Sequence, residues 1–536
     1  MSALTQRFSG GVSSPELAVF VSGVVSMGLE ILAGRMVAPQ FGSSIYTWGS
    51  IIGVFLAALS LGYYQGGKRA SQRATEERLV RVLLATGAFV AVLILAGDLL
   101  LAGLSGFPLP PRFASLPAVT VLFGPPTYLL GFISPYGAEL SMKESTGAAS
   151  GHVYAVGTIG SIVGAFGATF LLIPTLSVSL IGLVFGLLLV GTSLAILAPT
   201  FPRRTVLATL FVGVLLVGAV AVPSAGYSVR GETVYQTQTP YQELVVADLG
   251  DTRTLYLDGQ PHSAMDLEYR NRHVFEYTRY FHVPFLLADW RNETTTSAPH
   301  RSGDIDRVLF IGGGGFTGPK RFVDDYDVTV DVVEIDPEVI RVAKEHFGVE
   351  EGPNMNIYNA EGREFLRNTD ETYDLIVLDA YKKDKVPFQL TTREFMQLTA
   401  DRLDEDGILL ANLISAPTGP ASQFYRAEYK TIDQVYPQVY SFPTTGGSVV
   451  QNIEVVATKS DERVSQAQLE ARDERRDIGI GLSTELADYQ AEVETGDVPV
   501  LTDDRAPVDA LLEPMAGRRY VVSQTGPGGN ATAGTG

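Results

Sequence analysis

Seven apolar stretches occupy most of the first 226 residues, and they constrain the fold of this chain more than any other feature. They run over residues 16–37, 48–67, 80–104, 116–136, 152–173, 177–198 and 205–223. Each has about the 20 residues that a helix needs to cross the hydrocarbon core of a bilayer. Residues 1–226 are therefore predicted to form a multi-span transmembrane domain of about seven helices, and the chain to be a multi-pass protein of the cell membrane.

Charge separates this part from the remainder of the chain. Residues 1–226 contain 11 Lys and Arg against 7 Asp and Glu, whereas residues 227–536 contain 29 against 52. An acidic, lysine-poor surface repels phosphates, so we expect no nucleic-acid partner. The same surface is typical of proteins that stay soluble in high salt, which favours a halophilic source. There is no cysteine, and the six histidines show no zinc-binding spacing, so we expect no metal site.

The basic residues of the first part bear on its orientation, because loops rich in Lys and Arg stay cytoplasmic. Most of them fall on the side of the N-terminus, so seven spans would place the C-terminal part outside the cell. One miscounted span would reverse this, and the sequence leaves the side open. Three acids lie at membrane depth, Glu30, Asp98 and Glu139. They favour either interfacial positions and internal ion pairs or a cation site within the bundle.

Glycines recur in the fifth apolar stretch, at Gly157, Gly160, Gly164 and Gly167. Residues three and four apart share one face of a helix, and small residues there let two helix backbones approach closely. We interpret these glycines as a helix-packing face.

The pattern changes after Val222-Pro223. Alternating residues and turn signals predict a β-rich region at 228–260, followed by a helix at 267–288 and a polar loop at 291–303. Together these define a small β-rich subdomain over residues 227–303. The last residues, 521–536, are rich in Gly and Thr and are predicted to be a disordered tail.

Between these segments, residues 304–520 alternate strands with helices. The predicted strands are 307–311, 328–335, 356–359, 373–379, 407–413, 436–442 and 450–457. Strand–helix alternation predicts a parallel, Rossmann-like α/β sheet with right-handed crossovers.

Ligands of such sheets bind at the carboxyl ends of the strands, where four features fall. Glycines 312–315 follow the first strand, and glycine lets a backbone approach a ligand closely. Glu334 ends the second strand, where an acid can hold the hydroxyls of a ribose; Glu361-Gly362 and Asp379 follow the third and fourth. The glycine spacing does not match a dinucleotide motif, so a nucleoside-type ligand is predicted. Each acid could instead be a helix cap or a solvated strand end.

These motifs resemble the spermidine and spermine synthases, which are polyamine aminopropyltransferases. The matching segments, within residues 228–460, are Tyr241-Gln242, Leu257-Asp258-Gly259, Ile311–Gly315, Val333–Asp336, Glu361–Phe365 and Leu378-Asp379. The N-terminal part is similar to the membrane-fused, multi-spanning branch of that family at Gly42–Gly49 and Gly53–Ala58, as is the late segment Leu501–Val508. The resemblance implies a small β domain followed by a methyltransferase-like sheet.

In that family an aminopropyl group moves from decarboxylated S-adenosylmethionine to an amine, and methylthioadenosine is released. The resemblance implies this reaction here, with decarboxylated S-adenosylmethionine or S-adenosylmethionine as co-substrate, no tightly bound cofactor, and a small polyamine or diamine as acceptor. It implies that Asp379 accepts the proton of the amine. The implied methylthioadenosine-binding residues are Gln242, Gly312, Gly313, Gly314, Glu334, Glu361, Gly362 and Pro387, and the implied acceptor residues are Tyr241, Asp258, His262, Tyr381 and Asp384. Family members are often dimers or tetramers, so a homo-oligomer is an expectation of the resemblance.

The acceptor region departs from the family pattern. Gly315 stands where the family has an Asp that binds the amine of the transferred chain, and residues 275–280 replace its Tyr-His-Glu element. The second acid follows Asp379 by five residues rather than three, at Asp384 among lysines, and His262 could be a solvated loop residue. Two alternatives therefore stay open: an S-adenosylmethionine-dependent methyltransferase, or a non-catalytic transporter or sensor with a nucleoside- or amine-binding domain.

Overall fold

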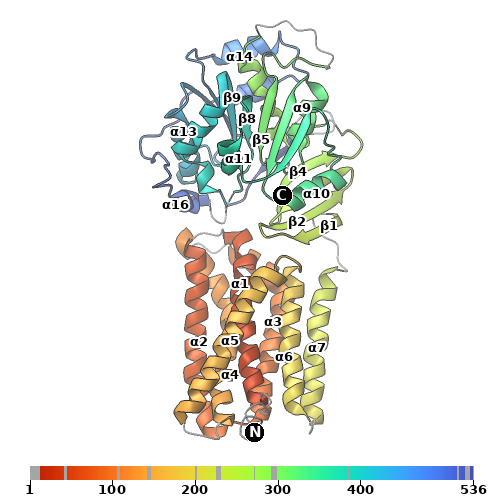
Figure 1. The fold of residues 1–536 in the computed structure, drawn as a ribbon, viewed down its shortest axis with the longest axis vertical. Coiled ribbons are helices and arrows are strands. Elements are labelled where there is room, and N and C mark those ends of the chain that lie inside the picture. Colours follow the sequence, from red (N-terminus) through yellow and green to blue (C-terminus); the bar gives the residue numbers. More distant parts are fainter. Residues whose placement is uncertain are drawn as a thin grey trace, which may run out of the picture. The chain divides into compact units, whose positions relative to one another are not determined.

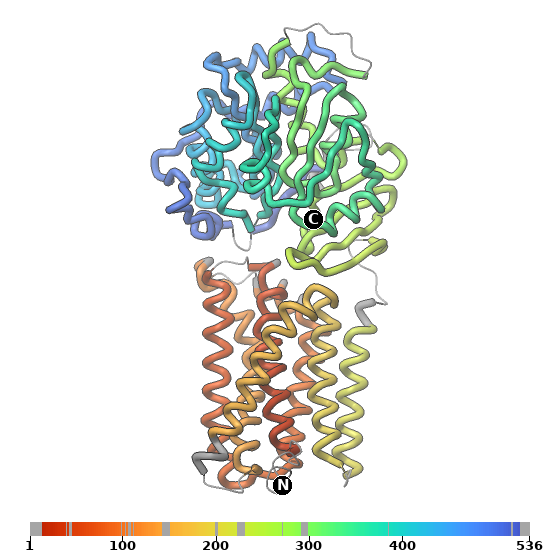
Figure 2. The backbone as a smooth tube through the Cα atoms, viewed as in Figure 1, coloured from red at the N-terminus to blue at the C-terminus, as the bar shows by residue number. Residues whose placement is uncertain are grey.

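The structure is a computed structural model that describes residues 13–41, 45–105, 109–141, 146–198, 202–224, 231–270, 272–290, 299–383, 385–515, 518–525 and 531–534. Its internal contacts divide the chain into two units, Met1–Tyr227 with Thr237–Pro240, and Ser228–Gln236 with Tyr241–Gly536. The backbone can be followed from red to yellow through the first unit and on to blue through the second (Figure 2).

Long helices build the first unit (Figure 1). Those described are α1 (Ser14–Phe41), α2 (Ile45–Arg73), α3 (Glu76–Ser105), α4 (Ser115–Leu140), α5 (Thr146–Gly167), α6 (Val178–Leu197) and α7 (Arg203–Ser224). Within the described residues, seven helices are long and apolar enough to cross a membrane, which confirms the predicted bundle. Glu139 is exposed near the end of α4, and Glu30 is partly buried in α1. The side chain of Asp98 lies outside what the structure describes.

Glycines allow the backbones of α1 and α5 to touch. A Cβ atom added at Gly160 would lie 2.2 Å from the carbonyl oxygen of Phe20, and one at Gly164 would lie 2.2 Å from that of Val24. No real side chain fits at such distances, so both positions require glycine. Gly167 has open space around its missing side chain. The packing interpretation therefore holds for Gly160 and Gly164 but not for Gly167.

The second unit contains a small sheet and a large one. The small sheet has the order β1 (Glu232–Gln238), β2 (Glu243–Leu249), β3 (Thr252–Leu257) and β4 (Gln260–Asp266), with β2, β3 and β4 antiparallel to one another. Its apolar face packs on α10 (Pro337–His346), where Leu244 and Val246 join one core with Val339 and Val342. The predicted β-rich region thus continues to Asp266.

The large sheet has the order β10-β11-β9-β8-β5-β6-β7. Its strands are β5 (Arg307–Ile311), β6 (Thr329–Glu334), β7 (Met355–Asn359), β8 (Tyr373–Leu378), β9 (Leu403–Ser415), β10 (Gln438–Pro443) and β11 (Gln451–Thr458). Strands β5 to β9 are parallel, but β11 is antiparallel to both β9 and β10. The prediction of a wholly parallel sheet is wrong for β11, because the link from β10 is too short for a crossover helix.

The apolar strands of this sheet are buried on both faces. Val308 and Phe310 of β5 enter one core, and their neighbours Leu309 and Ile311 enter the other. The first core is closed by α8 (Val283–Leu287), α9 (Thr317–Asp325) and α14 (Gln466–Asp473), and the second by α11 (Gly362–Asn368), α12 (Arg393–Arg402), α13 (Gln423–Asp433) and α16 (Val508–Leu512). Continuous apolar runs are typical of parallel strands covered by helices on both sides.

Two local predictions need correction. The helix expected at 267–288 begins only with the 3₁₀ helix Glu276–His282, which leads into α8, because the carboxylate of Asp266 holds the N–H groups of Glu268 and Tyr269 in a turn. Residues 521–536 are not disordered throughout: Val522–Thr525 form β12, and the N–H of Thr525 donates to the carbonyl of Val274 at 3.0 Å. Residues 291–298 of the predicted loop lie outside the described part of the chain.

The helix contact gives a matched pair of substitutions. Gly164→Ala places a methyl group against the carbonyl of Val24, so α1 and α5 must separate, and overpacking of this kind costs about 1–3 kcal/mol. We expect a lower apparent melting temperature in detergent, measured by tryptophan fluorescence. Gly167→Ala is the control and should melt like the wild type or above it, since alanine favours helix. Equal melting temperatures for the two variants would contradict the packing assignment.

Candidate active site

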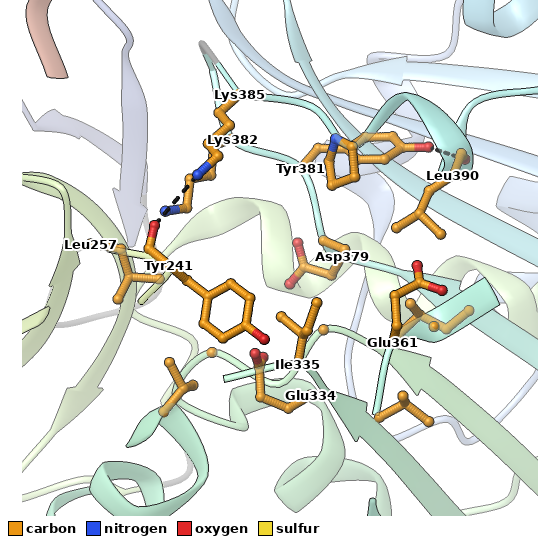
Figure 3. A pocket seen from close by; sticks show the side chains of 18 of the residues that line it. Tyr241, Leu257, Glu334, Ile335, Glu361, Asp379, Tyr381, Lys382, Lys385 and Leu390 are labelled. Atoms are coloured by element: carbon orange, nitrogen blue, oxygen red, sulfur yellow. Dashed lines mark hydrogen bonds between the residues drawn. The ribbon is translucent and has the colours of Figure 1, made fainter. Parts of the chain in front are cut away.

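The carboxyl ends of β5, β6, β7 and β8 surround one cavity (Figure 3). Its wall receives side chains from the ends of these strands and, on the other side, from the small sheet. The predicted site residues in this wall are Tyr241, Gln242, His262, Gly312, Gly314, Glu334, Glu361, Gly362, Asp379, Tyr381 and Pro387. Gly313 is not in the wall but bonds to Glu334, Asp258 lines a smaller neighbouring cavity, and Asp384 lies outside the described residues.

Asp379 is held where β8 ends by close packing against the glycine turn. Its N–H donates to the carbonyl of Ile311 at 2.9 Å. A Cβ atom at Gly312 would lie 2.3 Å from the carbonyl oxygen of Asp379, and Gly312 has a φ of +99°, so only glycine fits there. The first glycine of the turn is thus needed to bring β5 and the catalytic candidate together.

A chain of hydrogen bonds from β9 and β11 fixes the Asp379 carboxylate. Asn412 of β9 donates from Nδ2 to Asp379 Oδ1 at 2.8 Å, and Asn452 of β11 donates to Asn412 Oδ1 at 2.8 Å. The hydroxyl of Tyr520 donates to Asn452 Oδ1 at 2.6 Å. The chain therefore orients one carboxylate oxygen across three strands of the sheet, while the side chain faces the cavity (Figure 3).

Burial gives Asp379 an unusual protonation equilibrium. Desolvation raises the pKa of Asp379 to about 7. The hydrogen bond from Asn412 lowers this pKa, and the charge of Glu334 raises it further. A carboxyl group with a pKa near neutrality can both accept and release a proton at physiological pH. Such a shift in a cleft is typical of a functional acid or base.

Glu334 faces the same cavity from the end of β6. Its two carboxylate oxygens accept the N–H of Gly313 at 2.9 Å and the N–H of Asp336 at 2.8 Å. A carboxylate has about four acceptor positions, so further sites remain for ligand hydroxyls. Gln242 of the small domain donates to Asp336 at 3.2 Å, which ties the two sides of the cavity together.

The helix-cap interpretation of Glu361 is confirmed, and its contact with a ligand stays a prediction. Its side chain caps α11 by accepting the N–H of Glu364 at 2.9 Å, and it also lines the cavity. The next residue, Gly362, packs against Ile311, since a Cβ there would lie 2.5 Å from that side chain.

Two lysines after β8 line the cavity and contact the small domain. Lys382 pairs with Asp258 at 3.1 Å, and Lys385 donates to the carbonyl of Tyr241 at 3.4 Å. Both line the wall, whereas Asp258 is taken up by its ion pair and by the N–H of Glu243 at 2.9 Å. The predicted acceptor residue Asp258 therefore neutralises a lysine.

His262 lies in β4, so its interpretation as a solvated loop residue is wrong. Burial and the nearby Lys382 lower the pKa of His262 to about 3, which leaves its ring neutral at pH 7. Its carbonyl accepts the hydroxyl of Tyr277 at 3.0 Å. Tyr381, also in the wall, donates to the carbonyl of Leu390 at 2.7 Å, so its ring is fixed.

The polar residues inside β9 and β11 were not among the site residues predicted from the sequence. Besides Asn412 and Asn452, Glu454 is fully buried directly opposite Asn412. Neither carboxylate oxygen of Glu454 has a hydrogen-bond partner among the described residues, and burial, with Asp379 nearby, raises its pKa well above the usual range. A polar side chain within an apolar strand is costly, and that cost is the signal that could have found these residues.

Comparison with known proteins adds a family match to this geometry. Residues 293–458 match the spermine/spermidine synthase domain family. The polyamine aminopropyltransferase of Vibrio vulnificus is 26% identical over 270 residues, covering 48% of this chain and 84% of that protein. Polyamine aminopropyltransferase 2 of Aquifex aeolicus is 21% identical over 464 residues, 80% of this chain and 85% of that protein, so this similarity continues into the helical unit.

Solved structures are similar over the C-terminal unit. The crystal structure of a probable spermidine synthase from Corynebacterium glutamicum has a TM-score of 0.39 and 18% sequence identity. The match covers 51% of this chain and 96% of that one.

The raised pKa of Asp379 predicts a pH-dependent stability. The folded pKa of about 7 exceeds the ordinary 3.8, so the folded protein keeps a proton that the unfolded chain loses. Stability therefore falls as pH rises through this window, by at most about 4 kcal/mol once the pH exceeds 7. Asp379→Asn removes this penalty and should raise the apparent melting temperature more at pH 8 than at pH 5. A gain independent of pH would mean that Asp379 is already ionised at acidic pH.

Proposed function

Because the chain belongs to the spermidine and spermine synthase family, we propose that its C-terminal unit is an aminopropyltransferase held in a membrane by the N-terminal helices. The donor is decarboxylated S-adenosylmethionine, the acceptor is a small diamine or polyamine, and methylthioadenosine is the second product. The observation that carries this proposal is the buried Asp379, whose carboxyl titrates near neutrality in a cavity that also contains Glu334.

The donor binds with its nucleoside along the strand ends. Glu334, fixed by two backbone N–H groups, accepts the ribose hydroxyls, and the glycine turn lets the backbone approach the ligand. Glu361, Gly362 and Pro387 border the adenine, and Gln242 closes the cavity from the small domain. The acids around the cavity favour the positive sulfonium centre of the donor.

The transfer needs a neutral amine, because an ammonium group has no free electron pair. The ionised Asp379 takes a proton from the acceptor, and the nitrogen attacks the carbon next to the sulfonium sulfur. The new C–N bond forms as the C–S bond breaks. The electron pair of the C–S bond stays on sulfur, which becomes the neutral thioether of methylthioadenosine. The fixed position of Asp379 aligns the amine with the carbon that it attacks.

One observation favours a methyltransferase as the second candidate. A Cβ atom at Gly315 would lie 2.7 Å from the side chain of Ser263, and the Gly315 N–H donates to the Ser263 hydroxyl at 2.9 Å. The turn therefore has no room for the acid that the family uses to bind the amine of the transferred chain. A donor without that specific contact could be S-adenosylmethionine itself, with transfer of a methyl group.

The products separate these candidates. We expect purified full-length protein in detergent, given decarboxylated S-adenosylmethionine and a panel of diamines, to form methylthioadenosine and an amine heavier by one aminopropyl group, as measured by mass spectrometry. S-adenosylhomocysteine from S-adenosylmethionine would establish the methyltransferase instead. Asp379→Asn should lower turnover at least about a hundredfold. Asp404→Asn, which changes an exposed acid at the distant end of β9, is the matched control and should keep full activity. If nucleosides bind but neither product forms, the enzyme proposal is wrong.

Asn412 should set the acidic limb of the pH profile. Its hydrogen bond favours the ionised form of Asp379, so Asn412→Ala should raise the pKa of Asp379 above about 7. A bond to a charged group contributes about 1.5 kcal/mol, which corresponds to about one pH unit. The acidic limb of kcat/KM should therefore move to higher pH by that amount, measured with saturating donor. A loss of activity at every pH without a shift of the limb would give Asn412 a merely structural role.

A further inference from the structure

A second cavity in the C-terminal unit is lined by four cationic side chains. Arg270 and Arg272 follow β4, and Lys320 and Arg321 belong to α9. This cationic cleft shares no lining residue with the active-site cavity. Asp324 is the one acid in its lining. Residues 227–536 contain 29 basic and 52 acidic residues, so the positive charge of this cleft is opposite in sign to the net charge of the region.

Two of the four cations are matched by acids outside the lining. Arg272 pairs with Asp266 at 2.9 Å, and Arg321 pairs with Asp325 at 2.5 Å. These pairs orient the guanidinium groups without using all their donors. The Nε atoms of both arginines are buried and have no acceptor among the described residues.

The other two cations have no carboxylate contact in the described part of the chain. Arg270 is exposed and makes no hydrogen bond or ion pair there. Lys320 donates from Nζ to the carbonyl of Phe347 at 2.5 Å and to Sδ of Met265 at 3.8 Å, which leaves one of its three protons without an acceptor among the described residues. Burial lowers the pKa of Lys320 to about 8, and Arg270 contributes to this fall while Asp324 opposes it. The cleft therefore holds positive charge that the protein does not neutralise locally.

The chemistry of these groups selects the ligand. Guanidinium forks and an ammonium group match the oxygens of phosphate, and charge-assisted bonds of this kind are among the strongest in proteins. The cavity volume is about 180 Å³, which is the space of roughly six water molecules. It suits a compact anion rather than a macromolecule.

We propose that the cationic cleft is a binding site for a small anion with one or two phosphate groups, either free or at the end of an ester. The site is independent of the transfer reaction proposed above. The ligand lies against β4 and α9. Strand β4 also contributes His262 to the active-site cavity, and α9 follows the glycine turn of that cavity.

Isothermal titration calorimetry on the full-length protein in detergent tests this proposal. Inorganic pyrophosphate probes the free anion, and glycerol phosphate probes an ester without a nucleoside. We expect saturable binding of at least one of them that weakens as NaCl is raised. Arg270→Gln should weaken it about tenfold and Arg270→Gln with Lys320→Gln further, because each loses a charge-assisted contact. The single variant changes an exposed side chain, so it tests the site even if the double variant fails to fold.

Two controls locate the binding. Lys344→Gln with Arg393→Gln removes two partly exposed cations outside the cleft and should leave the affinity unchanged. Lys385→Gln removes a cation from the active-site cavity and should also leave it unchanged. The proposal is overturned if neither anion binds, if Arg270→Gln binds like the wild type, or if Lys385→Gln abolishes the signal.

Discussion

The burial of one carboxyl group at the end of a sheet covered on both faces is the constraint on which the C-terminal unit depends. Taking Asp379 out of water disfavours its charge, and the surrounding structure partly offsets this through the hydrogen bond from Asn412. That bond requires Asn452 and Tyr520 behind it, so a polar chain crosses strands that are otherwise apolar. The same burial holds the pKa of Asp379 near neutrality, which suits a general acid or base that works at physiological pH.

The glycine turn after β5 serves the same constraint from the other side. Gly312 must lack a side chain for the backbone to reach Asp379, and Gly313 presents its N–H to Glu334. Gly315 lies against Ser263 of the small sheet. Gly312, Gly313 and Gly315 thus contact three different neighbours around one cavity, namely Asp379, Glu334 and Ser263.

Electrostatics differ between the two cavities of this unit. The active-site cavity combines buried acids with lysines, and the ion pair of Lys382 with Asp258 reduces the repulsion that an amine acceptor would meet there. The cationic cleft keeps Arg270 and Lys320 without a carboxylate contact in the described residues. One acidic domain therefore contains two cavities that favour ligands of opposite charge. In each cavity the local pairing of side chains, rather than the net charge of the domain, decides which charge is favoured.

The sequence by itself determined most of the elements and the placement of acids after successive strands. Apolar stretches of membrane length, alternation of strands and helices, and acids after successive parallel strands each follow from local periodicity, so the bundle, the sheet and the cluster of Glu334, Glu361 and Asp379 could be predicted. Only the tertiary structure decided which partners those residues meet. Asn412 and Glu454 are distant in sequence from Asp379, and Asp258 of the small domain pairs with Lys382 of the large one, a pairing that no sequence spacing predicts. Side-chain pairing, burial and the resulting pKa values depend on contacts between distant segments, and those contacts exist only after the chain has folded.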